Sequence, residues 1–186
     1  YSHEEPVAVN EILICDSRGI ISERRSDVSE RPDKLRLARR TNRHLQEGSL
    51  AEAVVDADVF IGVSVGNVLT QDMIKNMSPD PIILALANPI PEIMPEEAKA
   101  AGAFVVGTGR SDFPNQVNNV LAFPGIFRGA IDARSPRITH DMKIAAAHAI
   151  AQAVKDPTPD MIIPPVLDKD VPYQLAKRVQ AVCANT

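Results

Sequence analysis

Residues 58–86 read DVFIGVSVGNVLTQDMIKNMSPDPIILAL, and this stretch decides the fold. It contains two short apolar runs, 58–63 and 82–86, and both are continuous rather than alternating. Continuous apolar runs are typical of parallel strands that are covered on both faces. Thr70 lies between them, where its hydroxyl can cap a helix over TQDMIKNM. The stretch therefore predicts a strand, a helix and a second strand parallel to the first.

The same alternation extends outward along the chain. Further apolar runs at 12–15 and 103–106 predict two more strands. Helix starts are indicated by a capping box at Ser49, a proline at Pro95 and a hydroxyl at Thr139. Strands that alternate with helices predict an α/β fold with a Rossmann-like, doubly wound parallel sheet. We expect residues 1–186 to form one domain, with its core over 10–135 and C-terminal helices over 136–186.

One expected feature of a dinucleotide-binding sheet is missing from the sequence. The glycine-rich turn G-x-G-x-x-G precedes the acidic residue of the second strand by about 20 residues. Only fifteen residues precede Asp16, and none is glycine. We therefore expect either an incomplete sheet, with its first strand and glycine-rich turn absent from this chain, or a fold that binds no dinucleotide.

Composition excludes several classes of protein. The chain is 45% hydrophobic and 24% charged, which suits one globular core. A net charge of −4 argues against a dedicated nucleic-acid partner. No apolar run is long enough to suggest a membrane span, and YSHEEP lacks the pattern of a signal peptide. The two cysteines are far apart, which favours a reducing compartment, so we expect a cytoplasmic protein.

Polar loops follow three of the predicted strands, at 64–67, 88–91 and 107–119. Ligands of doubly wound sheets bind beyond the carboxyl ends of the strands, where these loops converge. Small residues such as Gly62 and Gly66 would let a ligand approach the backbone closely. A single asparagine is also typical of turns, but three loops at one edge favour a binding site.

The segment 18–44 is locally basic, with nine Arg or Lys residues against four acidic ones. One interpretation is a solvated helix and loop. The other is that an arginine meets a cofactor phosphate, because Asp16 ends a predicted strand and Arg18, Arg24 and Arg25 follow it. In dinucleotide folds such an acid binds the ribose, and a nearby arginine accommodates a 2′-phosphate.

Signals for catalysis are absent from the sequence. It contains no HExxH pair, cysteine pair or carboxylate cluster suited to a metal, so we expect no metal ligand in this chain. It also lacks a G-x-S-x-G elbow and a P-loop. The residues indicate a place to bind, with no catalytic residue of its own.

Four segments together resemble the nicotinamide-cofactor domain of bacterial-type malic enzymes. They are DVFIGVSVGNVLT (58–70), ILALANPIPEIMPEEA (83–98), GTGRSDFPNQVNNVLAFPGIFRGAID (107–132) and ITHDMKIAAAHAIA (138–151). The resemblance runs from CDSRG to about IIPPVLDKDV. It implies oxidative decarboxylation of malate to pyruvate and CO2, with reduction of NAD or NADP and a divalent metal, Mg²⁺ or Mn²⁺. It also suggests a homo-oligomer.

The resemblance assigns roles to particular residues. Asp16 would bind the adenosine ribose, and Val63 and Ser64 would line the cofactor groove. Asn88 would meet both the nicotinamide and the substrate, while Asn118 and Asn119 would hold the malate carboxylate.

The family's catalytic lysine and tyrosine and its metal ligands lie N-terminal to the matched region. We therefore expect this chain to be inactive alone. Two alternatives remain open: a non-catalytic ligand-binding or regulatory domain derived from the same fold, and a structural assembly domain. The choice between NAD and NADP also stays open, with a slight lean toward NADP.

Overall fold

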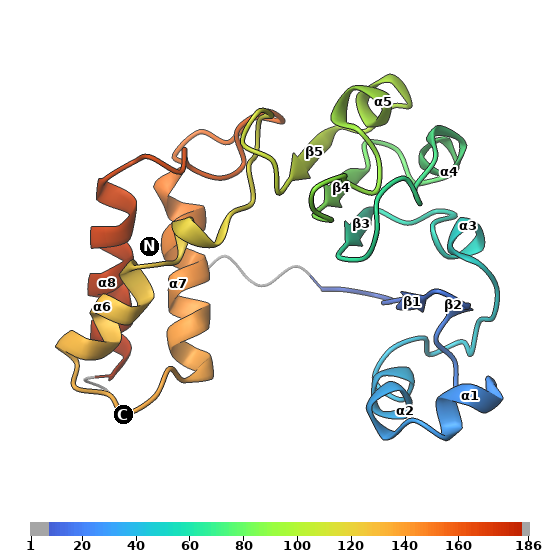
Figure 1. Ribbon diagram of the computed structural model, residues 1–186, viewed down its shortest axis with the longest axis horizontal. Helices are drawn as coiled ribbons and strands as arrows, with labels where there is room; N and C mark the ends of the chain where they lie inside the picture. The colour runs from blue at the N-terminus through green and yellow to red at the C-terminus, as the bar shows by residue number, and fades with distance from the viewer. Residues whose placement is uncertain (1–7, 184–186) are drawn as a thin grey trace. The chain divides into compact units, whose positions relative to one another are not determined.

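The computed structural model describes residues 8–183 (Figure 1), and the chain divides into two compact units at Ala57 and Asp58. The first unit contains a short antiparallel hairpin of β1 (Cys15–Asp16) and β2 (Gly19–Ile20). Its helices are α1 (Ser26–Ser29), α2 (Pro32–Ala38) and α3 (Leu50–Ala53). Its buried core is formed by Ile21, Val28 and Ala38, with Ile14 and Leu35 packed against them.

The predicted parallel strand at 12–15 is wrong. Only Cys15 of that run is in a strand, and it pairs antiparallel with Ile20 instead of joining the sheet of the second unit. The cause is local: Asp16 Oδ1 accepts the Arg18 N–H at 2.9 Å, and Gly19 takes a φ of 106°. These features close a tight turn, because glycine adopts positive φ without steric cost.

The second unit contains the parallel sheet that the sequence predicts. Its strands are β3 (Val59–Gly62), β4 (Ile82–Ala85) and β5 (Val105–Thr108), in the order β3-β4-β5. Helices α4 (Gln71–Lys75) and α5 (Pro95–Ala100) lie in the two crossovers (Figure 1). The Rossmann-like α/β fold is therefore confirmed.

The strands of this sheet differ in their burial. All four residues of β5 are buried, whereas Val59 and Ile61 of β3 are 46% and 62% exposed. The expectation that every strand is covered on both faces is wrong for β3. Val59 and Ile61 are two residues apart and therefore lie on the same face of the strand, which is exposed, whereas Phe60 and Gly62 lie on the opposite, buried face.

The C-terminal helices form a separate apolar core. A 3₁₀ turn, η1 (Asn119–Leu121), leads into α6 (Gly125–Asp132), followed by α7 (His140–Ala153) and α8 (Asp170–Cys183). The three helices pack side by side (Figure 1). Their shared core consists of Ile126, Ala130, Met142, Ala146, Ala149, Leu175 and Val179.

The predicted helix starts are confirmed. Thr70 Oγ1 accepts the Met73 N–H at 3.2 Å, and Thr139 Oγ1 accepts the Met142 N–H at 3.3 Å. Ser49 forms its capping box with Glu52. These contacts satisfy backbone donors that the first turn of a helix leaves free.

Candidate functional site

The carboxyl ends of the three parallel strands bring the predicted loops to one edge of the sheet. Gly62 lies opposite Ala85, and Ala85 lies opposite Thr108, so the loops that follow begin at neighbouring positions. Val63 is 78% exposed, and Ser64 and Asn88 are exposed as well. The structure thus places Val63, Ser64 and Asn88 at the open edge of β3 and β4.

A buried carboxylate that the sequence did not indicate lies behind this edge. Glu92 is fully buried. Its Oε1 accepts the Ser64 N–H at 2.9 Å, and its Oε2 accepts the Ala87 N–H at 3.0 Å. A buried carboxylate is tolerated when hydrogen bonds replace those it made to water. Glu92 therefore bonds the backbone at the starts of two neighbouring loops.

The glycines at this edge serve the protein's own packing. A Cβ on Gly62 would lie 2.3 Å from Cδ of Glu92, and one on Gly66 would lie 2.7 Å from Cγ2 of Ile90. Both distances are too short for a real side chain. The expectation that these glycines make room for a ligand is wrong, because Glu92 and Ile90 already occupy that room.

The asparagines that follow β5 differ in burial and in bonding. Asn115 is 5% exposed and has a φ of 53°. Its Nδ2 donates to the carbonyls of Val106 at 3.0 Å and Pro159 at 2.8 Å, and its Oδ1 accepts the Ile162 N–H at 2.8 Å. Asn115 therefore fixes the 159–162 loop.

Asn118 and Asn119, the two asparagines predicted to hold the malate carboxylate, lie on the surface. Asn118 Oδ1 accepts the Val120 N–H at 3.0 Å and caps η1, which leaves its NH2 group to donate elsewhere. The Asn119 side chain is exposed and makes no hydrogen bond within residues 8–183. The Val117 N–H donates to the Thr108 carbonyl at 2.8 Å. This bond brings the chain back to the end of β5 immediately before Asn118 and Asn119.

Asp16 lies in the first unit, at the end of β1, and is surrounded by cations. Its two oxygens accept from Arg25 at 2.9 and 3.1 Å, and Lys34 also bonds Oδ2. With the Arg18 N–H on Oδ1, four donors occupy the roughly four acceptor positions of a carboxylate. Arg25 above all, and then Lys34, hold the pKa of Asp16 far below its usual range.

Arg25 is also fully engaged. Its guanidinium bonds Asp27 at 2.8 Å as well as the Gly19 and Ile20 carbonyls, and its side chain is 12% exposed. Asp27 and Asp16 raise the pKa of Arg25. Of the three arginines predicted to meet a cofactor phosphate, Arg18 and Arg24 are exposed and Arg25 is committed to this cluster.

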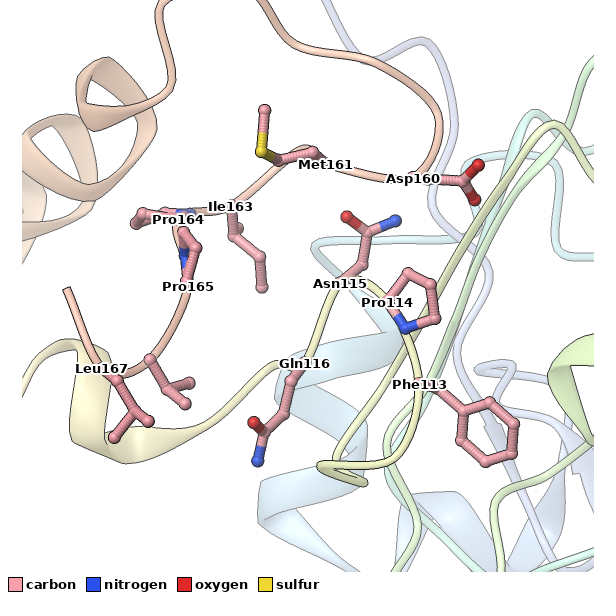
Figure 2. A pocket seen from close by; sticks show the side chains of 11 residues that line it. Phe113, Pro114, Asn115, Gln116, Asp160, Met161, Ile163, Pro164, Pro165 and Leu167 are labelled. Carbon is pink, nitrogen blue, oxygen red and sulfur yellow. The ribbon is translucent and has the colours of Figure 1, made fainter.

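A pocket of about 360 Å³ lies between the 113–116 segment and the loop over residues 160–167 (Figure 2). The Asn115 side chain points toward the 160–162 backbone, as its hydrogen bonds require. The acidic member of the lining, Asp160, is paired with Lys99. Two of the polar side chains of this pocket, Asn115 and Asp160, are thus engaged within the protein itself.

Neither a metal cluster nor a membrane span is found in the part of the chain that the structure describes. Within residues 8–183, no three His, Cys, Asp or Glu side chains come together in a way that could hold a metal ion. Over the same residues, no helix combines the length and apolar character needed to cross a membrane.

Exposed polar side chains of the strand-end loops and of η1 can donate and accept hydrogen bonds, as the polar parts of a dinucleotide or a small dicarboxylic acid require. Ser64 offers a hydroxyl, and Asn88 and Asn119 offer exposed amides that both donate and accept. Exposed polar groups beside the ends of parallel strands are the usual setting for such ligands.

Comparison with known proteins identifies relatives over most of the chain. The family model described as "Malic enzyme, NAD binding domain" matches residues 2–184. The bifunctional malic/malolactic enzyme of Bacillus subtilis is 54% identical over 184 residues, covering 96% of this chain and 44% of that protein. The NADP-dependent malic enzyme of Haemophilus influenzae is 51% identical over 141 residues, covering 75% of this chain and 18% of that protein.

A solved structure extends the similarity to the fold. The NAD-dependent malic enzyme of Thermotoga maritima superposes with a TM-score of 0.87 at 47% identity, covering 91% of this chain and 45% of that chain. The chain therefore spans less than half the length of the relatives that it matches.

Proposed function

Because the chain belongs to the family of malic enzyme NAD-binding domains, we propose that it forms the cofactor- and substrate-binding portion of a malic enzyme. Such an enzyme converts malate to pyruvate and CO2 and reduces NAD or NADP. The observation that carries the proposal is the exposure of Ser64 and Asn88 at the ends of two adjacent parallel strands. When bound there, the nicotinamide ring supplies the hydride acceptor.

In this proposal each residue at the strand ends has a distinct task. Val63 and Ser64 line the cofactor groove, where the exposed Val63 side chain offers an apolar surface. Asn88 contacts the nicotinamide side and the substrate. The free amide of Asn119 donates to a malate carboxylate, with the Asn118 NH2 beside it, in charge-assisted hydrogen bonds.

The proposed ribose contact at Asp16 requires an exchange of partners. Its acceptor positions are occupied, so a ribose hydroxyl would displace one donor, and Lys34, at 23% exposure, is the more exposed of the two side chains that donate to it. The displaced ammonium would then be free to meet a 2′-phosphate. With Arg18 at 70% exposure, this supports binding of NADP as well as NAD.

The proposal places the acid–base residues and the divalent metal in a part of the enzyme outside this chain. Its lysine and tyrosine would move the protons, and the metal would polarise the oxo group. We further propose that the enzyme acts as a homo-oligomer in the cytoplasm.

The test is malate-dependent reduction of NAD or NADP with Mg²⁺ or Mn²⁺, measured for pure residues 1–186 and for the full-length protein that contains them. The proposal predicts turnover in the full-length protein and none in the isolated chain. Turnover by the isolated chain would refute the proposal that the acid–base residues and the metal lie outside this chain. Dinucleotide binding without turnover in the full-length protein would favour the non-catalytic ligand-binding alternative.

A further inference from the structure

The carboxylate of Glu92 connects two loops that are distant in sequence. Ser64 follows β3 and Ala87 follows β4. The Oε1 atom of Glu92 accepts the Ser64 N–H at 2.9 Å, and its Oε2 atom accepts the Ala87 N–H at 3.0 Å. Ser64 Oγ lies 3.5 Å from the same Oε1. Since Asn88 is the next residue after Ala87, Glu92 bonds directly to Ser64 and to the residue before Asn88.

The backbone around Glu92 reinforces this connection. The Asn67 N–H donates to the Pro91 carbonyl, and the Leu69 N–H donates to the Glu92 carbonyl, both at 3.0 Å. The 87–92 turn is therefore bonded to the 64–69 loop by its side chain and by its main chain. The side-chain bonds are the ones that reach Ser64 and Ala87 at the starts of the two loops.

The chemistry of this position requires a carboxylate. Both partners are N–H donors, and an ionised carboxylate is an acceptor at both oxygens. Glutamine has almost the same shape but offers one acceptor and one NH2 group, so one backbone N–H would face another donor. Gly62 leaves the necessary space, because any Cβ there would lie 2.5 Å from Oε1 of Glu92.

We propose that Glu92 is a positioning residue that holds Ser64 and Asn88 in the arrangement that binds the dinucleotide. This inference rests on the proposed function, since it gives those two residues their ligand. Glu92 itself is fully buried and acts through the loops, without touching the cofactor.

The test compares Glu92→Gln with Glu97→Gln in the full-length protein. Glu97 is exposed on the first turn of α5 and provides a matched control. We expect Glu92→Gln to raise the KM and Kd for the dinucleotide by about 5- to 100-fold, since it leaves either the Ser64 or the Ala87 N–H without an acceptor. The KM for malate should change much less, and Glu97→Gln should behave as wild type. A merely structural role would lower the melting temperature and leave dinucleotide binding unchanged below it.

A second readout needs no activity. Hydrogen–deuterium exchange at the Ser64 and Ala87 amides should accelerate in Glu92→Gln and stay unchanged in Glu97→Gln. If Glu92→Gln fails to fold, Gly62→Ala takes its place, because the added methyl group displaces the carboxylate without removing it. Gly62→Ala should likewise raise the Kd for the dinucleotide.

Two outcomes would overturn the inference. One is unchanged dinucleotide binding in a folded Glu92→Gln protein, even if exchange at the two amides accelerates. The other is unchanged exchange at both amides. Failure of the wild-type protein to bind NAD or NADP would instead overturn the proposed function. The inference about the cofactor would fall with it, and amide exchange would still report whether Glu92 holds the two loops.

Discussion

The carboxylates of Asp16, in the first unit, and Glu92, in the second, are satisfied in different ways, although each unit also holds a buried asparagine that bonds backbone groups, Asn42 in the first and Asn115 in the second. In the first unit, Asp16 accepts hydrogen bonds mainly from the side chains of Arg25 and Lys34. In the second unit, Glu92 and Asn115 form hydrogen bonds with backbone groups at and near the strand ends. Flexible cationic side chains can reorient when a ligand arrives, whereas backbone amides bonded to a buried side chain fix the course of a loop. The first arrangement suits exchange of partners, and the second suits a preformed site.

The largest expected effect is on stability, and it should be greater for loss of Glu92 than for loss of Asp16. Glu92→Ala leaves the buried Ala87 N–H and the part-buried Ser64 N–H without acceptors and creates a small cavity, and should lower the free energy of unfolding by about 3–5 kcal/mol. Asp16→Ala should cost about 1–2 kcal/mol, because Arg25 keeps Asp27 and the exposed end of Lys34 reaches water. Chemical denaturation of both variants measures the difference. Equal losses would remove the distinction between the two regions.

Asn115 should behave as a neutral counterpart of Glu92. Asn115→Ala removes three hydrogen bonds to backbone groups and places alanine at a positive φ, so we expect a loss of about 2–4 kcal/mol. Limited proteolysis should then cut within 156–167 first. The control is Asn76→Ala, at an exposed asparagine after α4. If the 156–167 loop of the Asn115→Ala variant resists proteolysis, contacts other than those of Asn115 hold this loop.

Asn119 should affect kinetics rather than stability. Loss of one charge-assisted hydrogen bond in Asn119→Ala is worth about 1.5–3 kcal/mol, which corresponds to a loss of about 10- to 150-fold in kcat/KM for malate. Dinucleotide affinity should change much less. Kinetics and thermal melting of the full-length variant decide the matter, with Asn76→Ala as the control. A lower melting temperature with unchanged malate kinetics would make Asn119 a structural residue of η1.

The smallest effect concerns pH. Because Arg25 and Lys34 lower the pKa of Asp16 in the folded state, this carboxylate stabilises the first unit fully above its unfolded value of about 3.9. The contribution is lost as pH falls from there toward the folded pKa. Melting of Arg25→Met between pH 6 and pH 3 should therefore be less pH-dependent than that of wild type. The control is Arg40→Met, which removes an exposed cation of the same unit. Parallel pH profiles for Arg25→Met and wild type would contradict this account.

The sequence predicted those parts of the fold that depend on local signals. The strands β3 and β4, and the capped starts of α4 and α7, follow from apolar runs and from hydroxyls at helix starts. The run at 12–15 was misassigned because an apolar run does not specify its pairing partner. There, the turn at Asp16 and Gly19 decides the pairing.

The site was predicted less completely than the fold. Exposed Ser64, Asn88 and Asn119 follow from their places after predicted strands, and their ligand roles stay predictions. Glu92 was missed because charged residues are mostly exposed, and its burial depends on two loops that meet only in the folded sheet. A glycine within an apolar strand, as at Gly62, is the sequence signal that could have indicated close packing there.

The claim that the dinucleotide binds at the loops after β3 and β4 is tested most directly by hydrogen–deuterium exchange of the full-length protein, with and without NAD or NADP at saturating concentration. The account predicts slower exchange at 63–67 and 87–90 when the dinucleotide is bound, with no change on the exposed face of α7 around Lys143. Cofactor-dependent turnover without any protection at 63–67 and 87–90 would contradict it, because the dinucleotide would then bind elsewhere.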